Sequence, residues 1–87
     1  MEYDLVQTQS ITGYTSKQIQ AFLKISDRRL RHYCKLLRVS CPDEFEHPTG
    51  SGFYSPESYR AIKKVRSLFK LGATESQVIN TLKLEGF

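Results

Sequence analysis

The residues best suited to recognition chemistry lie in one short stretch, residues 28–35, which reads RRLRHYCK. It holds three arginines, one histidine, one tyrosine and one lysine. An arginine guanidinium can pair with two acceptors at once, which suits guanine edges and phosphate oxygens. The stretch therefore indicates binding to a nucleic acid, and the alternative is a basic helix that is only solvated.

The charge is distributed unevenly along the chain, whose formal net charge is +4. Residues 14–41 hold seven cations and one anion, whereas residues 42–59 hold four anions and no cation. Such asymmetry in a small domain favours a face that meets a polyanion. Because the acids Asp43, Glu44 and Glu46 would repel DNA, we expect their loop to face away from DNA or to contact a protein partner.

Metal, cofactor and catalytic interpretations find little support in the residues. Cys34, Cys41 and His47 lack the spacing of a compact zinc site. A nucleophilic cysteine needs a neighbouring base, but His32 points away from Cys34 on a helix. Residues 50–52 (GSG) lack the helix and the lysine of a phosphate-binding loop. We therefore expect no metal, no cofactor and no enzymatic activity.

Length and hydropathy limit the number of domains and the cellular compartments that are compatible with the chain. The 87 residues make one domain at most, with a small core. No apolar run approaches the ~20 residues that span a bilayer, and the N-terminus lacks the pattern of a secretion signal. Two cysteines in such a chain favour free thiols in a reducing compartment. We expect a cytoplasmic protein, associated with the nucleoid, that has no membrane partner.

The elements that must position the basic stretch are two helices joined by a tight turn. Thr15 or Ser16 is a good N-cap, and apolar residues at helical spacing predict a helix over residues 16–24. Ser26 can cap a second helix with Asp27 in its first turn. The cations of this second helix lie outside its apolar stripe, which consists of Leu30, Tyr33 or Cys34, and Leu37.

The rest of the chain predicts a loop and two more helices. Residues 40–52 are rich in turn formers and lead to the aromatic residues 53–54, which indicates a loop or a short hairpin. A third helix follows with Pro56 at its first position, and Gly72 is a natural stop. A capping box predicts a last helix over residues 74–84.

Three segments in this order resemble the N-terminal winged helix-turn-helix domain of MerR-type transcription regulators: residues 25–33 (ISDRRLRHY), 53–57 (FYSPE) and 71–75 (LGATE). The resemblance extends over residues 14–82. It implies a mainly α fold with about four helices and a short β-hairpin wing, and we expect this domain to occupy residues 14–87. For residues 1–13 three alternatives stay open: a short strand, an arm that packs on a neighbour, or a frayed end.

The recognition helix of such a domain lies in the major groove with its N-terminal residues towards the base edges. Arg28 is therefore the first choice for base readout. The resemblance places Arg31 and Tyr33 where the family grips the phosphate backbone. Alternatively, Tyr33 belongs to the core, and Arg31 pairs with Glu57 or Glu75. The full set of expected DNA contacts is Thr15, Lys17, Ser26, Asp27, Arg28, Arg29, Arg31, His32, Tyr33, Lys35, Tyr54, Arg60 and Lys63.

Three features depart from the family pattern. Gly52 stands where the family's wing has a phosphate-binding arginine, and His32 replaces an aromatic residue. Arg60 and Lys63 of the third helix could compensate for the lost wing contact. Phe87 closes the sequence before the family's long dimerisation helix and effector domain. The chain is then either part of a longer protein or a dimer formed through other surfaces, such as its N-terminal segment.

These observations lead to a sequence-specific, double-stranded DNA-binding transcription regulator. We expect a homodimer that binds a two-fold symmetric site through the basic helix at residues 26–37. Repression is favoured over activation, because a chain without an effector domain can still block a promoter. Two alternatives stay open: an excisionase-like or transposon-associated architectural protein that bends DNA, and a protein-interaction adaptor that docks a partner through the acidic loop and Tyr3, Leu5 and Val6.

Overall fold

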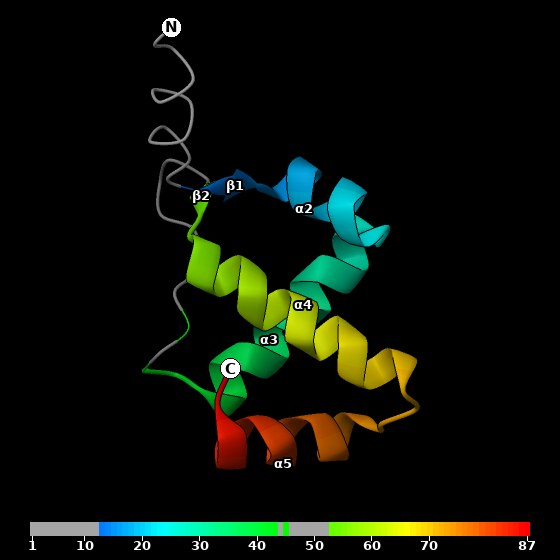
Figure 1. Cartoon of the computed structure of the whole chain (residues 1–87), viewed down its shortest axis with the longest axis vertical. Helices are drawn as coiled ribbons and strands as arrows, with labels where there is room; N and C mark the ends of the chain where they lie inside the picture. The colour runs from blue at the N-terminus through cyan, green and yellow to red at the C-terminus, as the bar shows by residue number, and fades with distance from the viewer. Residues whose placement is uncertain (1–12, 44, 46–52) are drawn as a thin grey trace, which may run out of the picture.

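The helices and strands of the computed structural model, which describes residues 13–43, 45 and 53–87, follow the order expected of a winged helix-turn-helix (Figure 1). In the described residues the elements are β1 (Tyr14–Thr15), α2 (Ser16–Leu23), α3 (Asp27–Ser40), β2 (Phe53–Tyr54), α4 (Pro56–Lys70) and α5 (Glu75–Glu85). The predicted mainly helical fold is confirmed. The expected arm or strand at residues 1–13 falls outside the described residues, apart from Gly13.

Helix α2 begins and ends at local signals that the sequence carries. The Thr15 hydroxyl accepts the Gln18 backbone N–H at 3.1 Å, and the Gln18 side chain accepts the Thr15 N–H at 2.9 Å. The helix ends where Lys24 adopts a left-handed conformation with φ of 54°. The Ile25 N–H then donates to the Gln20 carbonyl at 3.0 Å, which closes the turn. This turn sets the angle at which α3 leaves α2.

The other helices are capped in the same way. The Ser26 hydroxyl accepts the Arg29 backbone N–H at 3.1 Å and so starts α3. Helix α4 opens with Ser55 as N-cap and Pro56 at its first position. Helix α5 opens with a second capping box, in which Thr74 and Gln77 bond reciprocally. The predicted starts of all three helices are confirmed.

Helix α3 is the centre of the fold, because α2, α4 and α5 all pack against it. Figure 1 shows α4 crossing in front of α3, with α2 at one end and α5 at the other. The fully buried residues form one cluster drawn from all four helices, and the largest of them are Ile19, Leu30, Leu37, Ile62, Val65, Val78 and Leu82. One side of α3 is thereby committed to the core, and the opposite side is left to solvent.

The small sheet joins segments that lie far apart in the sequence. Strand β1 pairs with β2 in antiparallel register, Tyr14 opposite Tyr54 and Thr15 opposite Phe53. The loop or short hairpin expected within residues 40–54 lies mostly outside the described residues; in the described part, β2 pairs with the strand that precedes α2. A Cβ atom at Gly13 would lie only 2.7 Å from the Tyr54 carbonyl oxygen, so the close approach of the two strands requires glycine there.

Within residues 13–43, 45 and 53–87, none of the helices combines the length and the apolar character that crossing a membrane requires.

Candidate nucleic-acid interface

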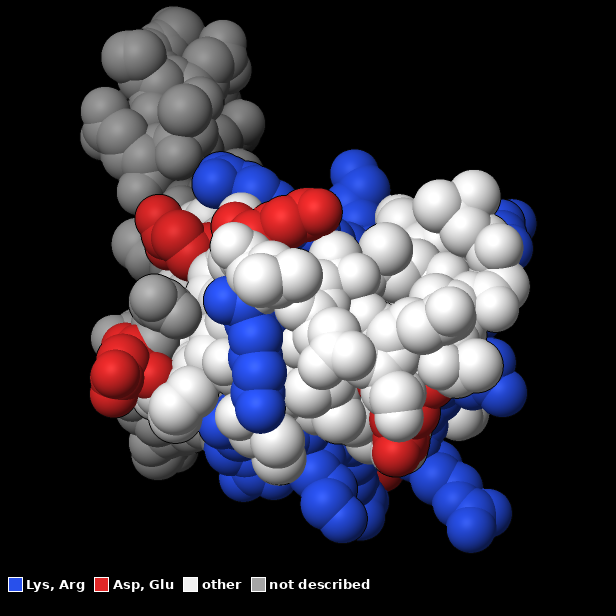
Figure 2. Space-filling view, turned by 90° about the horizontal axis from the view of Figure 1, so that it is seen from below, with Lys and Arg blue, Asp and Glu red and all other residues white. Residues whose placement is uncertain are grey.

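The exposed face of α3 is strongly basic. Opposite the buried stripe, this helix presents exposed cations on three successive turns: Arg28, Arg31, Lys35 and Arg38. We call these four residues the basic face. Figure 2 shows that Lys and Arg side chains crowd the lower edge of that view, the side on which α3 lies behind α4 in Figure 1. The sequence prediction of a basic helix face is therefore matched by its exposure in the fold.

The acid of the first turn is paired within the helix. Asp27 and Arg31 form an ion pair with an O–N distance of 2.5 Å, one turn apart. The Gln20 side-chain amide donates to Asp27 at 3.5 Å. Arg31 thus pairs with Asp27 rather than with Glu57 or Glu75, the two partners considered from the sequence. The ion pair with Asp27 holds the Arg31 guanidinium along the helix surface, and the Arg31 side chain stays largely exposed.

Arg28 has a different environment from Arg31. It is exposed in the first turn of α3 and forms no ion pair with any carboxylate of the described residues. The N-terminal turn is the part of a recognition helix that comes closest to base edges. The structure therefore leaves the Arg28 guanidinium available for a bidentate contact.

Tyr54 of β2 is buried and contacts α3. The Cys34 thiol donates to the Tyr54 hydroxyl oxygen across 4.0 Å. Burial raises the pKa of the Cys34 thiol to about 11, and burial together with the neighbouring Cys34 raises the pKa of Tyr54 to about 12. Both groups therefore stay protonated at neutral pH. The contact between Cys34 and Tyr54 joins α3 to β2. The expected contact of Tyr54 with DNA stays a prediction.

The two thiols lie inside the domain. Cys34 and Cys41 are buried free cysteines, and the Cys41 thiol donates to the Leu82 carbonyl at 3.6 Å. Across the part of the chain that the structure describes, no three His, Cys, Asp or Glu residues gather as metal ligands do.

The other side of α3 faces α4 and the start of α5. The His32 Nε2 atom lies 2.8 Å from a Glu75 carboxylate oxygen, and both side chains are about half exposed. Tyr33 is only 4% exposed and stacks on Phe69, with ring centroids 5.6 Å apart and planes inclined by 14°. The structure thus places Tyr33 in the core, as the sequence alternative had it, while His32 stays at the surface.

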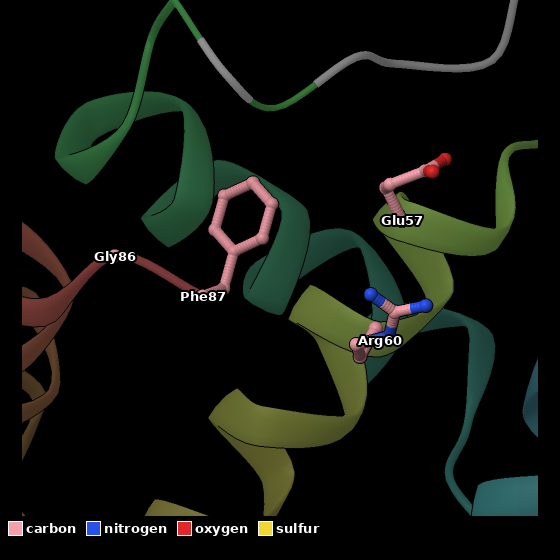
Figure 3. Close-up of a pocket in the computed structure, with 4 residues that line it drawn as sticks. All are labelled: Glu57, Arg60, Gly86 and Phe87. Carbon is pink, nitrogen blue, oxygen red and sulfur yellow. The ribbon is translucent and has the colours of Figure 1, made fainter.

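The remaining residues expected to contact DNA lie at the helix caps, on α2 and on α4. Thr15 and Ser26 use their hydroxyls as helix caps, and Lys17 is exposed in the first turn of α2. Lys63 is exposed on α4. Arg60 lies apart from the basic face, because it lines a pocket of about 280 Å³ together with Glu57 and the C-terminal residues Gly86 and Phe87 (Figure 3).

Three cations that the sequence analysis did not single out line a groove beside α3. Two adjoining hollows of about 390 and 170 Å³ share Arg29, Tyr33 and Phe69. Lys24, Arg66 and Lys70 complete the basic lining of the smaller hollow. We call the two hollows together the flank groove. The spacing of Arg66 and Lys70, one turn apart on α4 around Phe69, was the available signal in the sequence.

A basic helix after a tight turn, next to a strand pair and two supporting helices, defines the winged helix-turn-helix class of DNA-binding domains. The family model of the MerR HTH family regulatory proteins matches residues 14–85. The chain belongs to this family of DNA-binding transcription regulators, as the resemblance implied. No curated protein and no solved structure matches the chain.

Proposed function

We propose that this protein binds a specific sequence in double-stranded DNA by placing the basic face of α3 in the major groove. The observation that carries the proposal is the composition of this face: its cations are exposed, and the single acid of α3, Asp27, is already paired with Arg31. The major groove of B-DNA is about 12 Å wide and admits one helix. Cations on three turns of such a helix can meet bases at one end and phosphates along its length.

The roles within the basic face follow from position. Arg28 lies in the first turn and has no carboxylate partner among the described residues, so it reads a base; guanine is the base whose O6 and N7 atoms suit a bidentate arginine. Arg31 is held along the helix by Asp27 and is better placed for a phosphate than for a base edge. Lys35 and Arg38 lie further from the N-terminus and contact phosphates as point charges.

We further propose that two copies act together on a two-fold symmetric site and that the regulatory outcome is repression. A single recognition helix contacts few base pairs, so two copies provide the sequence length that selective binding in a genome needs. Bound at a promoter, the protein would block transcription by occupying that stretch of DNA. Sedimentation of the protein–duplex complex tests this stoichiometry: two protein chains per selected duplex support the proposal, and one chain contradicts it.

The test of base readout is selection of a duplex from random sequences, followed by affinity measurements for the wild type, Arg28→Ala and Lys83→Ala. Lys83 is an exposed cation on α5, so Lys83→Ala is a control that removes one positive charge, as Arg28→Ala does. We expect Arg28→Ala to lose about 1–3 kcal/mol of preference for the selected duplex over a random one. Lys83→Ala should keep the preference. Equal preference in all three proteins would refute base readout by Arg28.

A further inference from the structure

The flank groove is a second basic surface, next to the basic face but built by other residues. Its walls come from three places: Lys24 at the end of α2, Arg29 in the first turn of α3, and Arg66 and Lys70 in the last turns of α4. Its floor is the stacked pair Tyr33 and Phe69. The floor packs on the core, so the cations stand around a rigid apolar base.

Within the described residues, no carboxylate balances the charges of this groove. None of the four cations Lys24, Arg29, Arg66 and Lys70 forms an ion pair with a carboxylate of the described residues, and no acid lines either hollow. His32, which lines the larger hollow, contacts the Glu75 carboxylate at 2.8 Å. Like charges gathered over an apolar floor repel one another, and an anion between them relieves that repulsion.

We propose that the flank groove binds a phosphate group. The two arginines, Arg29 and Arg66, present planar guanidinium donors that match phosphate oxygens bidentately, and Lys24 and Lys70 add charge from the rim. Arg66 is partly buried, which limits how far its guanidinium can move. The groove is therefore a phosphate site independent of base readout.

The source of the phosphate is expected to be DNA, and this part rests on the proposed function. With α3 in the major groove, one sugar-phosphate backbone passes on the α4 side of the helix, where the flank groove opens. The same chemistry accepts a free phosphate ester, such as a nucleotide whose base lies against the Tyr33–Phe69 floor.

The first arm of the test measures DNA affinity across a salt series for the wild type, Arg66→Gln/Lys70→Gln and the charge-matched control Lys64→Gln/Lys83→Gln. Each phosphate contact contributes about 0.9 to the log–log slope of affinity against salt. We expect the groove variant to lower the magnitude of this slope by about 1–2 and to keep the preference for the selected duplex. The control should change the slope by less than half as much.

The second arm titrates the DNA-free protein with inorganic phosphate and then with AMP, followed through backbone amide resonances. Saturable shifts around Tyr33 and Phe69 that vanish in the groove variant would assign the site to a free phosphate ester. A slope change in the first arm without such shifts would assign it to the DNA backbone. Equal slopes for the two double variants together with no saturable shift would overturn the proposal.

Two controls keep the outcomes distinct. Melting temperatures of the variants show whether Arg66→Gln unfolds the domain, and in that case Lys70→Gln is compared with Lys83→Gln, since both lysines are exposed. If the wild type binds no duplex at all, the proposed DNA function fails, and the phosphate titration alone decides on the groove.

Discussion

The carboxylate of Asp27 lies 2.5 Å from the guanidinium of Arg31, one turn along α3. This pair neutralises the acid at the end of the helix that we propose to enter the major groove. It also separates the arginines of the basic face into one that is held, Arg31, and one that is free to find a base, Arg28. The division of roles proposed for these arginines depends on this contact.

Replacing Asp27 by asparagine should strengthen binding to random duplex DNA by about fivefold at moderate salt, because it removes a negative charge and releases Arg31. The cost in unfolding free energy should be about 0.5 kcal/mol, since an acid in the first turn stabilises the helix dipole. Fluorescence anisotropy and urea unfolding measure the two effects. Asp43→Asn removes an exposed acid away from α3 and should leave affinity nearly unchanged; an equal gain there would contradict this role for Asp27.

Alanine at Gly13 should destabilise the strand pair. Its Cβ would lie 2.7 Å from the Tyr54 carbonyl oxygen, a main-chain atom that cannot rotate away. We expect a loss of about 1–3 kcal/mol in unfolding free energy, the range for overpacking a close contact. Thermal or urea unfolding measures it, with Ser76→Ala on the exposed start of α5 as a neutral comparison. A Gly13→Ala protein as stable as the wild type would show that β1 and β2 separate without cost.

Glycine at Lys24 should stabilise the turn between α2 and α3. Lys24 has φ of 54°, a left-handed conformation that is unfavourable for any residue with a Cβ atom. Lys24→Gly should raise the unfolding free energy by about 0.5–1 kcal/mol. Lys35→Gly, in the middle of α3, should instead lower it by about 1 kcal/mol. Destabilisation by both glycines would rule out strain at Lys24.

The thiol of Cys34 should make stability fall at alkaline pH. Burial raises its pKa from the ordinary 9.0 to about 11, so the folded state holds this proton more tightly than the unfolded chain does. The resulting stability is fully present below pH 9 and is lost as the pH rises through 11, by up to about 2–3 kcal/mol. Tyr54, with its pKa raised to about 12, acts in the same direction.

Urea unfolding between pH 7 and pH 11 measures this decline. Cys34→Ala should show a shallower fall than the wild type, and Tyr54→Phe separates the contribution of the phenol. A decline equally steep in Cys34→Ala would mean that other groups, the lysines among them, account for it.

The helices could be predicted from the sequence because their signals are local. Thr15 with Gln18, and Thr74 with Gln77, are capping boxes whose partners lie three residues apart, and each opens the expected helix. The partner of Arg31 was also within reach, since Asp27 lies four residues earlier, although the sequence interpretation looked to more distant acids.

The contacts between distant segments could not be predicted in the same way. The pairing of Tyr14 with Tyr54 and the contact of His32 with Glu75 depend on how α4 and α5 pack against α3. The flank groove is likewise made from α3, α4 and the turn after α2, and the spacing of Arg66 and Lys70 on α4 does not reveal that Lys24 and Arg29 lie beside them. Tyr33 could be placed on the apolar stripe, but its burial is decided by Phe69, which stacks on it.

The most direct test of the central claim is an amide resonance titration of the wild-type protein with its selected duplex at physiological salt. If α3 enters the major groove, the largest shifts will fall on Arg28, Arg31 and Lys35, with smaller ones along the flank groove. The exposed surface of α5 should remain nearly unchanged. Shifts confined to α5, or spread evenly over all cations at every salt concentration, would contradict recognition through α3.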